Sequence, residues 1–261
     1  MANEMAKPPG LAPEYGAQFQ DAAIVAAYQH RAPYPLETFE ILAQLACVRP
    51  SILDLGCGTG DLTGGLSGFA ASVDAIDLSP PMIAAAEKCA LPNVRWAVGA
   101  AETAPLEGPY DLITAAESLH WMDWTRLFPR LTSVLAPDGV LAIVARSYVH
   151  TEWWDPGFQA LIDRHSTNTA YQSYDLVGEL CQRGLFSVAG NRRTVPVPFE
   201  QSVAHLVEAF HSRNGFSRDR MTADAARGFD AEATSHLASF ADGGVLKLGV
   251  QANVTWGRPR D

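Results

Sequence analysis

The feature that most constrains the fold is a short apolar segment that ends in three closely spaced glycines. It comprises residues 52–60, whose sequence is ILDLGCGTG. An apolar run of this length is typical of a buried strand. Glycines after such a strand allow a tight turn into a helix and bring backbone N–H groups close to a ligand. Residues 61–69 then have the character of a helix. The segment predicts a strand–loop–helix unit with a ligand at its loop.

The same alternation continues along the chain. Further strands are expected at residues 71–77, 94–98, 110–115, 140–145, 186–197 and 245–256. Helices are expected at residues 19–28, 36–47, 123–135 and 201–213, after Ser79 and Pro80, and in a polar stretch that runs to Phe240. This order predicts an α/β fold with a parallel sheet covered by helices on both faces.

Charge and cysteine content narrow the range of partners. The chain carries 19 Lys and Arg against 29 Asp and Glu, a net charge of −10, which disfavours nucleic acid as a substrate. The four cysteines are scattered without the spacing of a zinc site or a disulfide framework, and no metal is predicted. The sequence has neither a signal peptide nor an apolar run of membrane-spanning length. We therefore expect a cytoplasmic protein with no membrane partner.

The residues around the glycines discriminate between possible ligands. Asp61 and Thr63 stand where the dinucleotide fingerprint would need its third glycine, and the loop lacks the lysine of a phosphate-binding P-loop. Asp54 precedes the glycines and Asp61 follows them. Two carboxylates would repel the negative charge of a pyrophosphate and would attract a cationic ligand.

Residues 54–60, DLGCGTG, resemble the first motif of the class I S-adenosylmethionine-dependent methyltransferases, whose cofactor carries a sulfonium and an ammonium but no phosphate. Asp77, at the end of the next predicted strand, stands where this family places an acid on the ribose hydroxyls. Residues 77–82, DLSPPM, resemble the family's D-x-S-x-x-M, in which Leu78 and Met82 would flank the adenine. The resemblance implies S-adenosyl-L-methionine as cofactor.

Later segments extend the resemblance. Residues 98–102 resemble the third motif, so Ala101 and Glu102 are expected at the adenine edge, although Ala100 replaces a polar residue that many relatives carry. Residues 110–121 and 135–141 resemble the fourth motif and the turn into the fifth strand. The cofactor-binding residues implied by the resemblance are Tyr28, Arg31, Asp54, Gly56, Gly58, Gly60, Asp77, Leu78, Met82, Ala101, Glu102 and Glu117.

The resemblance also implies the fold and the domain organisation of the chain. It predicts a Rossmann-like, doubly wound sheet of seven strands, the last one antiparallel, with a helical lid. Residues 1–13 are expected to be a flexible tail, and residues 14–147 to form the cofactor-binding core with its N-terminal covering helices. Residues 148–261 are expected to continue the same domain, with a lid insertion at about 200–242 before the last strand.

The acceptor site is expected next to residues 117–121, ESLHW, which follow the fourth strand. This segment is similar to a subgroup (methyltransferase type 11) that includes trans-aconitate methyltransferase-like and other small-molecule enzymes. His120 is the candidate general base and substrate contact, with a structural role as the alternative. Trp121, with Trp153 or Trp154, is expected to line an apolar acceptor pocket.

Two further assignments come from outside the central motifs. Residues 28–35 resemble the R-P-x-Y-P segment of this subgroup, except that the order here is Arg31, Ala32, Pro33. By that likeness Tyr28 and Arg31 lie near the methionine end of the cofactor. His211 lies in the predicted lid and is assigned to the substrate.

The sequence thus predicts an enzyme that transfers a methyl group directly and in line to a small-molecule acceptor, at a carboxylate or hydroxyl oxygen. Two alternatives remain open, namely a nucleic-acid or protein methyltransferase and a catalytically silent cofactor-binding partner protein. A homodimer is a further possibility.

Overall fold

The computed structural model describes residues 7–260, which form two compact units. The sheet unit comprises Ala32–His150, Leu176–Phe199 and the chain from Lys247. The helical unit comprises the chain up to Arg31, Thr151–Asp175 and Glu200–Leu246. Residues 1–6 of the predicted tail lie outside the described residues. Each unit is therefore assembled from segments that are distant in the sequence.

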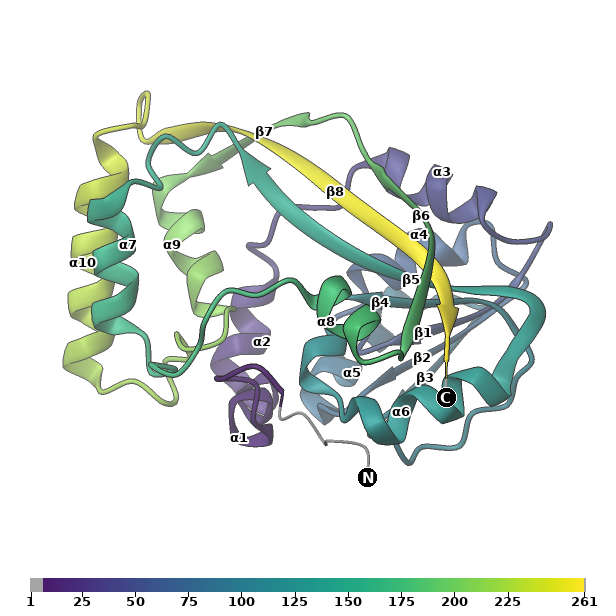
Figure 1. The fold of residues 1–261 in the computed structure, drawn as a ribbon. Coiled ribbons are helices and arrows are strands. Elements are labelled where there is room, and N and C mark those ends of the chain that lie inside the picture. The colour runs from purple at the N-terminus through teal and green to yellow at the C-terminus, as the bar shows by residue number, and fades with distance from the viewer. Residues whose placement is uncertain (1–6, 261) are drawn as a thin grey trace. The chain divides into compact units, whose positions relative to one another are not determined.

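The sheet contains β1 (Ser51–Leu55), β2 (Ser72–Asp77), β3 (Val94–Val98), β4 (Tyr110–Ala116), β5 (Leu135–Val149), β6 (Phe186–Arg193), β7 (Val197–Ser202) and β8 (Val245–Pro259). Its order is β3-β2-β1-β4-β5-β8-β6, and β7 also pairs with β8. Strands β1 to β5 pair in parallel, whereas β8 runs antiparallel to β5 and β6. Figure 1 shows the long β5 and β8 side by side. The predicted Rossmann-like sheet with an antiparallel last strand is confirmed.

The eighth strand arises where the sequence predicts one continuous strand over residues 186–197. The structure interrupts this segment after Arg193 and resumes it as β7 at Val197. Pro196 lies in the interruption and has no N–H with which to continue the ladder. The sheet therefore has eight strands in place of the expected seven.

The helices of the sheet unit are α3 (Leu36–Gln44), α4 (Asp61–Ser67), α5 (Pro80–Ala86), α6 (Trp124–Val134) and α8 (Leu176–Gln182), with short 3-10 turns η2 (Glu87–Cys89) and η3 (Leu119–Trp121). Helix α5 begins as its sequence predicts, because the Ser79 hydroxyl accepts the Met82 N–H and Pro80 needs no partner. Ile52 of β1 and Leu112 of β4 pack with Leu42 of α3 and Leu62 of α4 in a buried cluster. This core fixes the carboxyl ends of β1, β2 and β4 beside one another.

The helical unit contains α1 (Pro13–Gly16), η1 (Ala17–Gln20), α2 (Ala22–Tyr28), α7 (Pro156–His165), α9 (Val203–His211) and α10 (Ala223–Ala238). Helices α7 and α10 lie side by side in Figure 1, and α10 also contacts α9. Buried aromatic rings fill the centre: Phe158 lies 5.3 Å from Phe210, and Phe216 lies 4.8 Å from Phe229, between ring centroids. Aromatic packing therefore holds this unit together.

The N-terminal segment belongs to the helical unit. The Asp21 carboxylate accepts a hydrogen bond from the Ser217 hydroxyl at 2.8 Å and pairs with Arg220. Ile24 and Ala27 of α2 are buried, and α2 contacts α9. The segment predicted to cover the cofactor is thus part of a helical core. Across residues 7–260, no helix combines the length and apolarity needed to span a membrane.

Candidate functional site

The glycine loop connects β1 to α4 at the carboxyl edge of the sheet. Gly56, Gly58 and Gly60 all have positive φ, at 66°, 56° and 88°, in the left-handed region that favours glycine. A Cβ on Gly56 would come within 2.4 Å of the Ser118 Cβ. The Gly56 N–H donates to the Ile76 carbonyl at 2.8 Å, which fastens the loop to the end of β2. The loop is therefore anchored at Gly56, and its backbone carries no side chain at three positions.

Asp77 lies at the end of β2, directly beside this loop. Its Oδ2 accepts the Gly58 N–H at 2.9 Å, and its Oδ1 accepts the Ser79 N–H at 2.8 Å. Burial raises the pKa of Asp77, and these two hydrogen bonds oppose that effect without cancelling it. The side chain remains half-buried, and each carboxylate oxygen has a second lone pair. Asp77 can therefore accept two hydroxyl donors without giving up its loop contacts.

Asp54 occupies a different environment from Asp77. It is 1% exposed, and its oxygens accept hydrogen bonds from the Thr63 and Thr114 hydroxyls at 2.6 and 2.8 Å. Burial raises the pKa of Asp54 to about 6, while these two bonds act in the opposite direction. The side chain thus joins β1 to α4 and β4 inside the sheet unit.

The loop after β3 is hydrogen-bonded to α6 and to the residue that precedes it. The Ala101 carbonyl accepts a hydrogen bond from Arg130 Nη1 at 2.5 Å, and Glu102 Oε1 accepts the Asp123 N–H at 2.6 Å. Leu78, in the loop after β2, is 53% exposed, whereas Met82 is buried in α5. Of the two predicted adenine flanks, only Leu78 presents its side chain at the surface.

The end of β4 carries the residues assigned to the methyl-transfer position. Glu117 has a φ of 52°, and its N–H donates to the Val144 carbonyl. The Ser118 hydroxyl donates to the Leu55 carbonyl at 2.6 Å, which ties this end to β1. His120 and Trp121 follow in η3, with ring centroids 4.6 Å apart, and both side chains are partly exposed. The sheet unit therefore brings together the glycine loop, Asp77, Glu117 and His120 along one edge.

Arg146, near the end of β5, was not among the predicted site residues. Its Nη1 donates to the Ala32 carbonyl, and its guanidinium lies 4.5 Å above the Tyr34 ring. Its Nη2 lies 3.6 Å from Glu117 Oε2, although the Arg146 side chain is only 10% exposed. The available sequence signal was a cation directly after an apolar strand, at the edge where ligands bind in open α/β sheets.

Tyr28 and Arg31 lie in the helical unit, beside each other. The Arg31 guanidinium lies 3.9 Å above the Tyr28 ring, and its Nε donates to the Ser212 hydroxyl at 2.8 Å. Arg31 thereby connects the turn after α2 to the end of α9. The structure brings these two residues together in a unit separate from the one that carries the glycine loop.

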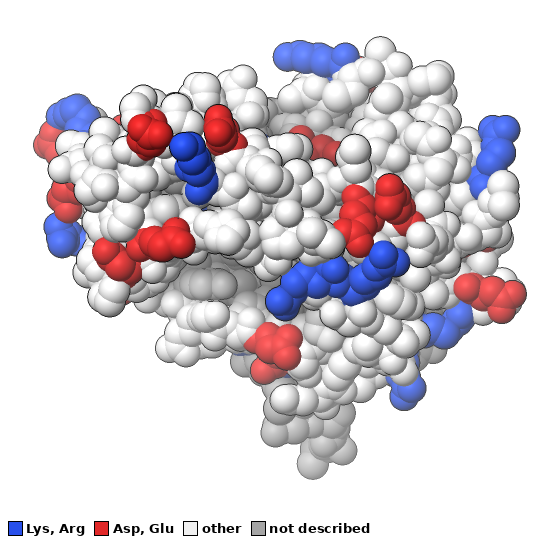
Figure 2. Space-filling view, turned by 90° about the horizontal axis from the view of Figure 1, so that it is seen from above, with Lys and Arg blue, Asp and Glu red and all other residues white. Residues whose placement is uncertain are grey.

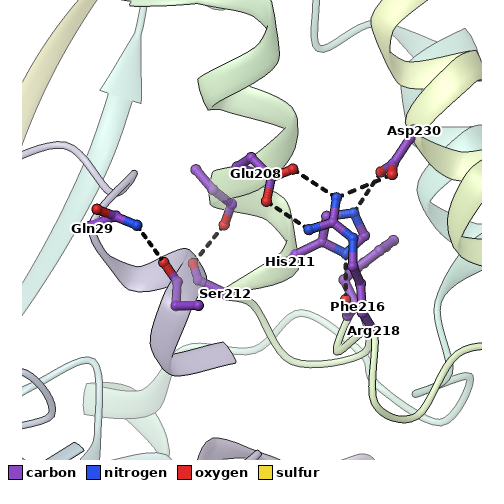
Figure 3. Close-up of polar contacts among 9 residues, drawn as sticks. Gln29, Glu208, His211, Ser212, Phe216, Arg218 and Asp230 are labelled. Carbon is purple, nitrogen blue, oxygen red and sulfur yellow. Dashed lines mark hydrogen bonds and ion pairs between the residues drawn. The ribbon is translucent and has the colours of Figure 1, made fainter. Parts of the chain in front are cut away.

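Trp153 and His211, both assigned to the substrate, are in the interior of the helical unit at 2% and 0% exposure. His211 Nδ1 lies 2.7 Å from the Phe216 carbonyl, and Nε2 lies 2.6 Å from Asp230 Oδ1 (Figure 3). Arg218 bridges Asp230 and Glu208 in the same network. Because both His211 nitrogens are already engaged, contact with a substrate would require this network to open.

Comparison with known proteins agrees with this architecture. Residues 52–139 match a family described as a methyltransferase domain. An uncharacterized methyltransferase of Mycobacterium tuberculosis is 38% identical over 122 residues, which are 46% of this chain and 49% of the relative. The trans-aconitate 2-methyltransferase of Escherichia coli (strain 55989) is 41% identical over 112 residues, 42% of this chain and 40% of the relative. The chain thus spans about half the length, or less, of these relatives.

Among solved structures, a putative type II methyltransferase from Anaeromyxobacter dehalogenans has a TM-score of 0.62 at 24% identity. The similarity covers 87% of this chain and 97% of the other, and it shows the fold. The expected resemblance to methyltransferases is confirmed over residues 52–139, which match this domain family. The matched residues include the glycine loop, Asp77, Glu117 and His120.

Proposed function

We propose that this protein binds S-adenosyl-L-methionine and transfers its methyl group to an oxygen of a small-molecule acceptor. The observation that carries the proposal is the pairing of Asp77 with the glycine loop. A half-buried carboxylate held by the Gly58 and Ser79 N–H groups keeps free lone pairs for a ribose diol. A Cβ at Gly56 or Gly60 would collide with Ser118 or the Trp96 ring, at 2.4 and 2.8 Å. The residues present therefore fit this cofactor.

Each end of the cofactor has proposed contacts. Asp77 would hold the ribose, while Leu78 and the loop residues Ala101 and Glu102 would meet the adenine. Gly56, Gly58 and Gly60 keep the loop backbone open near the middle of the cofactor. Glu117, a partly exposed carboxylate, would take the methionyl ammonium, and the buried Asp54 would support the loop from below.

The cofactor, when bound, supplies a methyl group on a sulfonium, which is already a good leaving group. The protein's remaining task is to align the acceptor oxygen in line with the S–CH3 bond. His120, partly exposed in η3, is the proposed group that orients the acceptor or takes its proton. Trp121 beside it offers an apolar surface for the acceptor.

A carboxylate is the favoured acceptor. The Escherichia coli relative is named for methylation of trans-aconitate, a small polycarboxylate, and its matching region is 41% identical to this chain. A carboxylate is ionised at neutral pH, so His120 would orient it and would not need to remove a proton. An alcohol or phenol would need a base at the same position.

Charge favours a small molecule over a nucleic acid. The net charge is −10, and on the face drawn in Figure 2 acidic and basic side chains are interspersed across a mostly uncharged surface. A phosphate backbone needs a concentrated basic surface, because its affinity comes mainly from Lys and Arg contacts. A mobility-shift assay with tRNA at low salt tests this alternative.

Cofactor binding is tested by isothermal titration with S-adenosylhomocysteine. Asp77→Ala should weaken binding by about 10- to 150-fold, since it removes a charged acceptor of two hydrogen bonds. Asp74→Asn, earlier in the same strand, alters a carboxylate that pairs with Arg95 and serves as the control, with unchanged affinity expected. Equal affinity of folded Asp77→Ala and the wild type would refute this placement of the cofactor.

The acceptor is tested with a panel of di- and tricarboxylates, alcohols, phenols and amines, with S-adenosylhomocysteine release as the readout. Methyl esters release methanol in mild base, whereas methyl ethers and methylamines do not. Turnover of polycarboxylates to base-labile products is expected. Turnover confined to amines or to tRNA would contradict methylation of a small molecule at oxygen.

A further inference from the structure

The contacts of Arg146 join three segments at the carboxyl edge of the sheet. Its backbone N–H lies 3.3 Å from Glu117 Oε1, and its Nη2 lies 3.6 Å from Glu117 Oε2. Its Nη1 donates to the Ala32 carbonyl, and its face covers the Tyr34 ring. One side chain therefore links the ends of β4 and β5 to the segment before α3.

Glu117 needs such a constraint. Its φ of 52° is unusual for a residue with a side chain and is held by the bond from its N–H to the Val144 carbonyl. A glutamate side chain has several rotatable bonds, and the loss of rotamer entropy opposes its fixation. Because both carboxylate oxygens meet Arg146, the carboxylate is fixed in one orientation before any ligand arrives.

The charges around Arg146 also favour a fixed orientation of Glu117. Burial lowers the pKa of Arg146, but its neighbours, Glu117 and Asp61 among them, outweigh burial and raise it overall. The cluster thus contains one firmly charged cation and two carboxylates, at the edge where a ligand with an ammonium group is expected. Without the cation, Glu117 would lose the opposite charge that holds its carboxylate in this orientation.

We propose that Arg146 is a positioning residue that fixes Glu117 for the ammonium group at the methionyl end of the cofactor. The inference rests on the proposed function and deepens it. Arg146 acts through Glu117 and does not itself touch the ligand, because its guanidinium is buried against Ala32, Tyr34 and Glu117. The acceptor's carboxylate, accordingly, is bound by another group.

Two ligands can distinguish a positioning role of Arg146 from a merely structural one. S-adenosylhomocysteine carries the methionyl end, whereas 5′-methylthioadenosine keeps the adenosine and lacks the amino-acid group. Arg146→Gln should weaken S-adenosylhomocysteine about tenfold and leave 5′-methylthioadenosine within about twofold of the wild type. Arg146→Lys, which retains the charge, should recover part of the loss. Equal weakening of both ligands would overturn the proposal, because a merely structural role would affect both.

A double-mutant cycle tests the dependence on Glu117. In the Glu117→Gln background, Arg146→Gln should change the affinity for S-adenosylhomocysteine less than about twofold. Independent, additive effects would overturn the proposal. Arg258→Gln is the matched control, because this arginine donates to the Pro137 and Gly139 carbonyls near the beginning of β5, at the opposite end of the strand from Arg146. It should leave the affinity for both ligands unchanged.

Failure of the proposed function gives a different result from failure of this inference. A wild-type protein that binds neither S-adenosylhomocysteine nor 5′-methylthioadenosine would refute the cofactor assignment and everything that rests on it. In the other case, the wild type and the Arg146→Gln variant bind both ligands with equal affinity. That result would leave the proposed function standing and would show that Arg146 has no role in cofactor binding.

Discussion

The hydroxyl of Thr63 lies 2.6 Å from the carboxylate of Asp54, in a part of the sheet unit where Asp54 is only 1% exposed. Burial raises the pKa of Asp54 from 3.8 to about 6. The folded protein therefore retains this proton at pH values where the unfolded chain has lost it. The contribution to stability is complete below about pH 4 and is lost as the pH rises to about 6.

This relationship predicts the behaviour of Asp54→Asn. The wild type should lose up to about 3 kcal/mol of unfolding free energy through this group between pH 4 and 7, and the variant should lack that decline. Urea unfolding at a series of pH values measures the difference. Parallel stability curves for the two proteins would mean that Asp54 titrates normally.

Replacing glycine with alanine should have opposite effects on stability at Gly56 and at Gly64. Gly56→Ala places a Cβ 2.4 Å from the Ser118 Cβ at a positive φ, so we expect a loss of about 2–4 kcal/mol and weaker cofactor binding. Gly64→Ala, in α4, meets no atom within 4 Å and should stabilise the protein by about 0.5–1 kcal/mol. Thermal unfolding distinguishes the two variants, and a stable Gly56→Ala would show that the loop tolerates a side chain.

Deletion of residues 1–31 should unfold the helical unit. It removes the buried Ile24 and Ala27 of α2 and leaves Ser217 and Arg220 without Asp21. The aromatic core would then be exposed to water. Circular dichroism should show a loss of helix, while hydrogen exchange remains slow in β1 and β4. A truncated chain with full helical content would show that this segment is dispensable for folding.

His211 should be important for stability. His211→Gln removes a fully buried ring that meets the Phe216 carbonyl and Asp230, with an expected loss of about 2–4 kcal/mol. His205→Gln, on the exposed side of α9, is the control and should change stability by less than about 0.5 kcal/mol. Chemical unfolding provides the comparison. If the two variants are equally stable, the network in Figure 3 contributes little.

His120→Ala distinguishes the two kinds of acceptor. With an alcohol or phenol, removal of a base should lower kcat about 100-fold or more. With a carboxylate, the substitution should mainly raise KM, and the wild-type rate should be flat above about pH 6. Steady-state kinetics on the acceptor found in the panel decides between them. Normal kcat and KM in the variant would assign His120 a structural role.

Local sequence patterns accounted for the parts of the fold that depend on neighbouring residues. The apolar run before Gly56 predicts β1, and Ser79 with Pro80 predicts the start of α5, because capping and turn geometry are set within a few positions. The position of Asp77 after its strand was likewise visible, since the carboxyl ends of parallel strands meet at one edge.

Pairing between strands decided the roles of Asp54 and Arg146. Asp54 lies opposite Thr114 in the register of β1 and β4, which turns a carboxylate next to the glycines into a buried junction. Arg146 meets Glu117 because β4 and β5 run in parallel, with Ala116 opposite Val144. The sequence around Asp54 or Arg146 does not predict these contacts, because the register of a sheet depends on both strands that pair.

The sequence by itself determined the strand–loop–helix unit, the succession of the central strands along the chain and the residues that resemble the methyltransferase motifs. Only the tertiary structure decided that residues before Arg31 join α7, α9 and α10 in a separate helical unit. It also decided that His211 and Trp153 are buried there. The physical reason is that burial of large aromatic side chains depends on which distant segments meet, whereas turns, caps and strand ends are specified by adjacent residues.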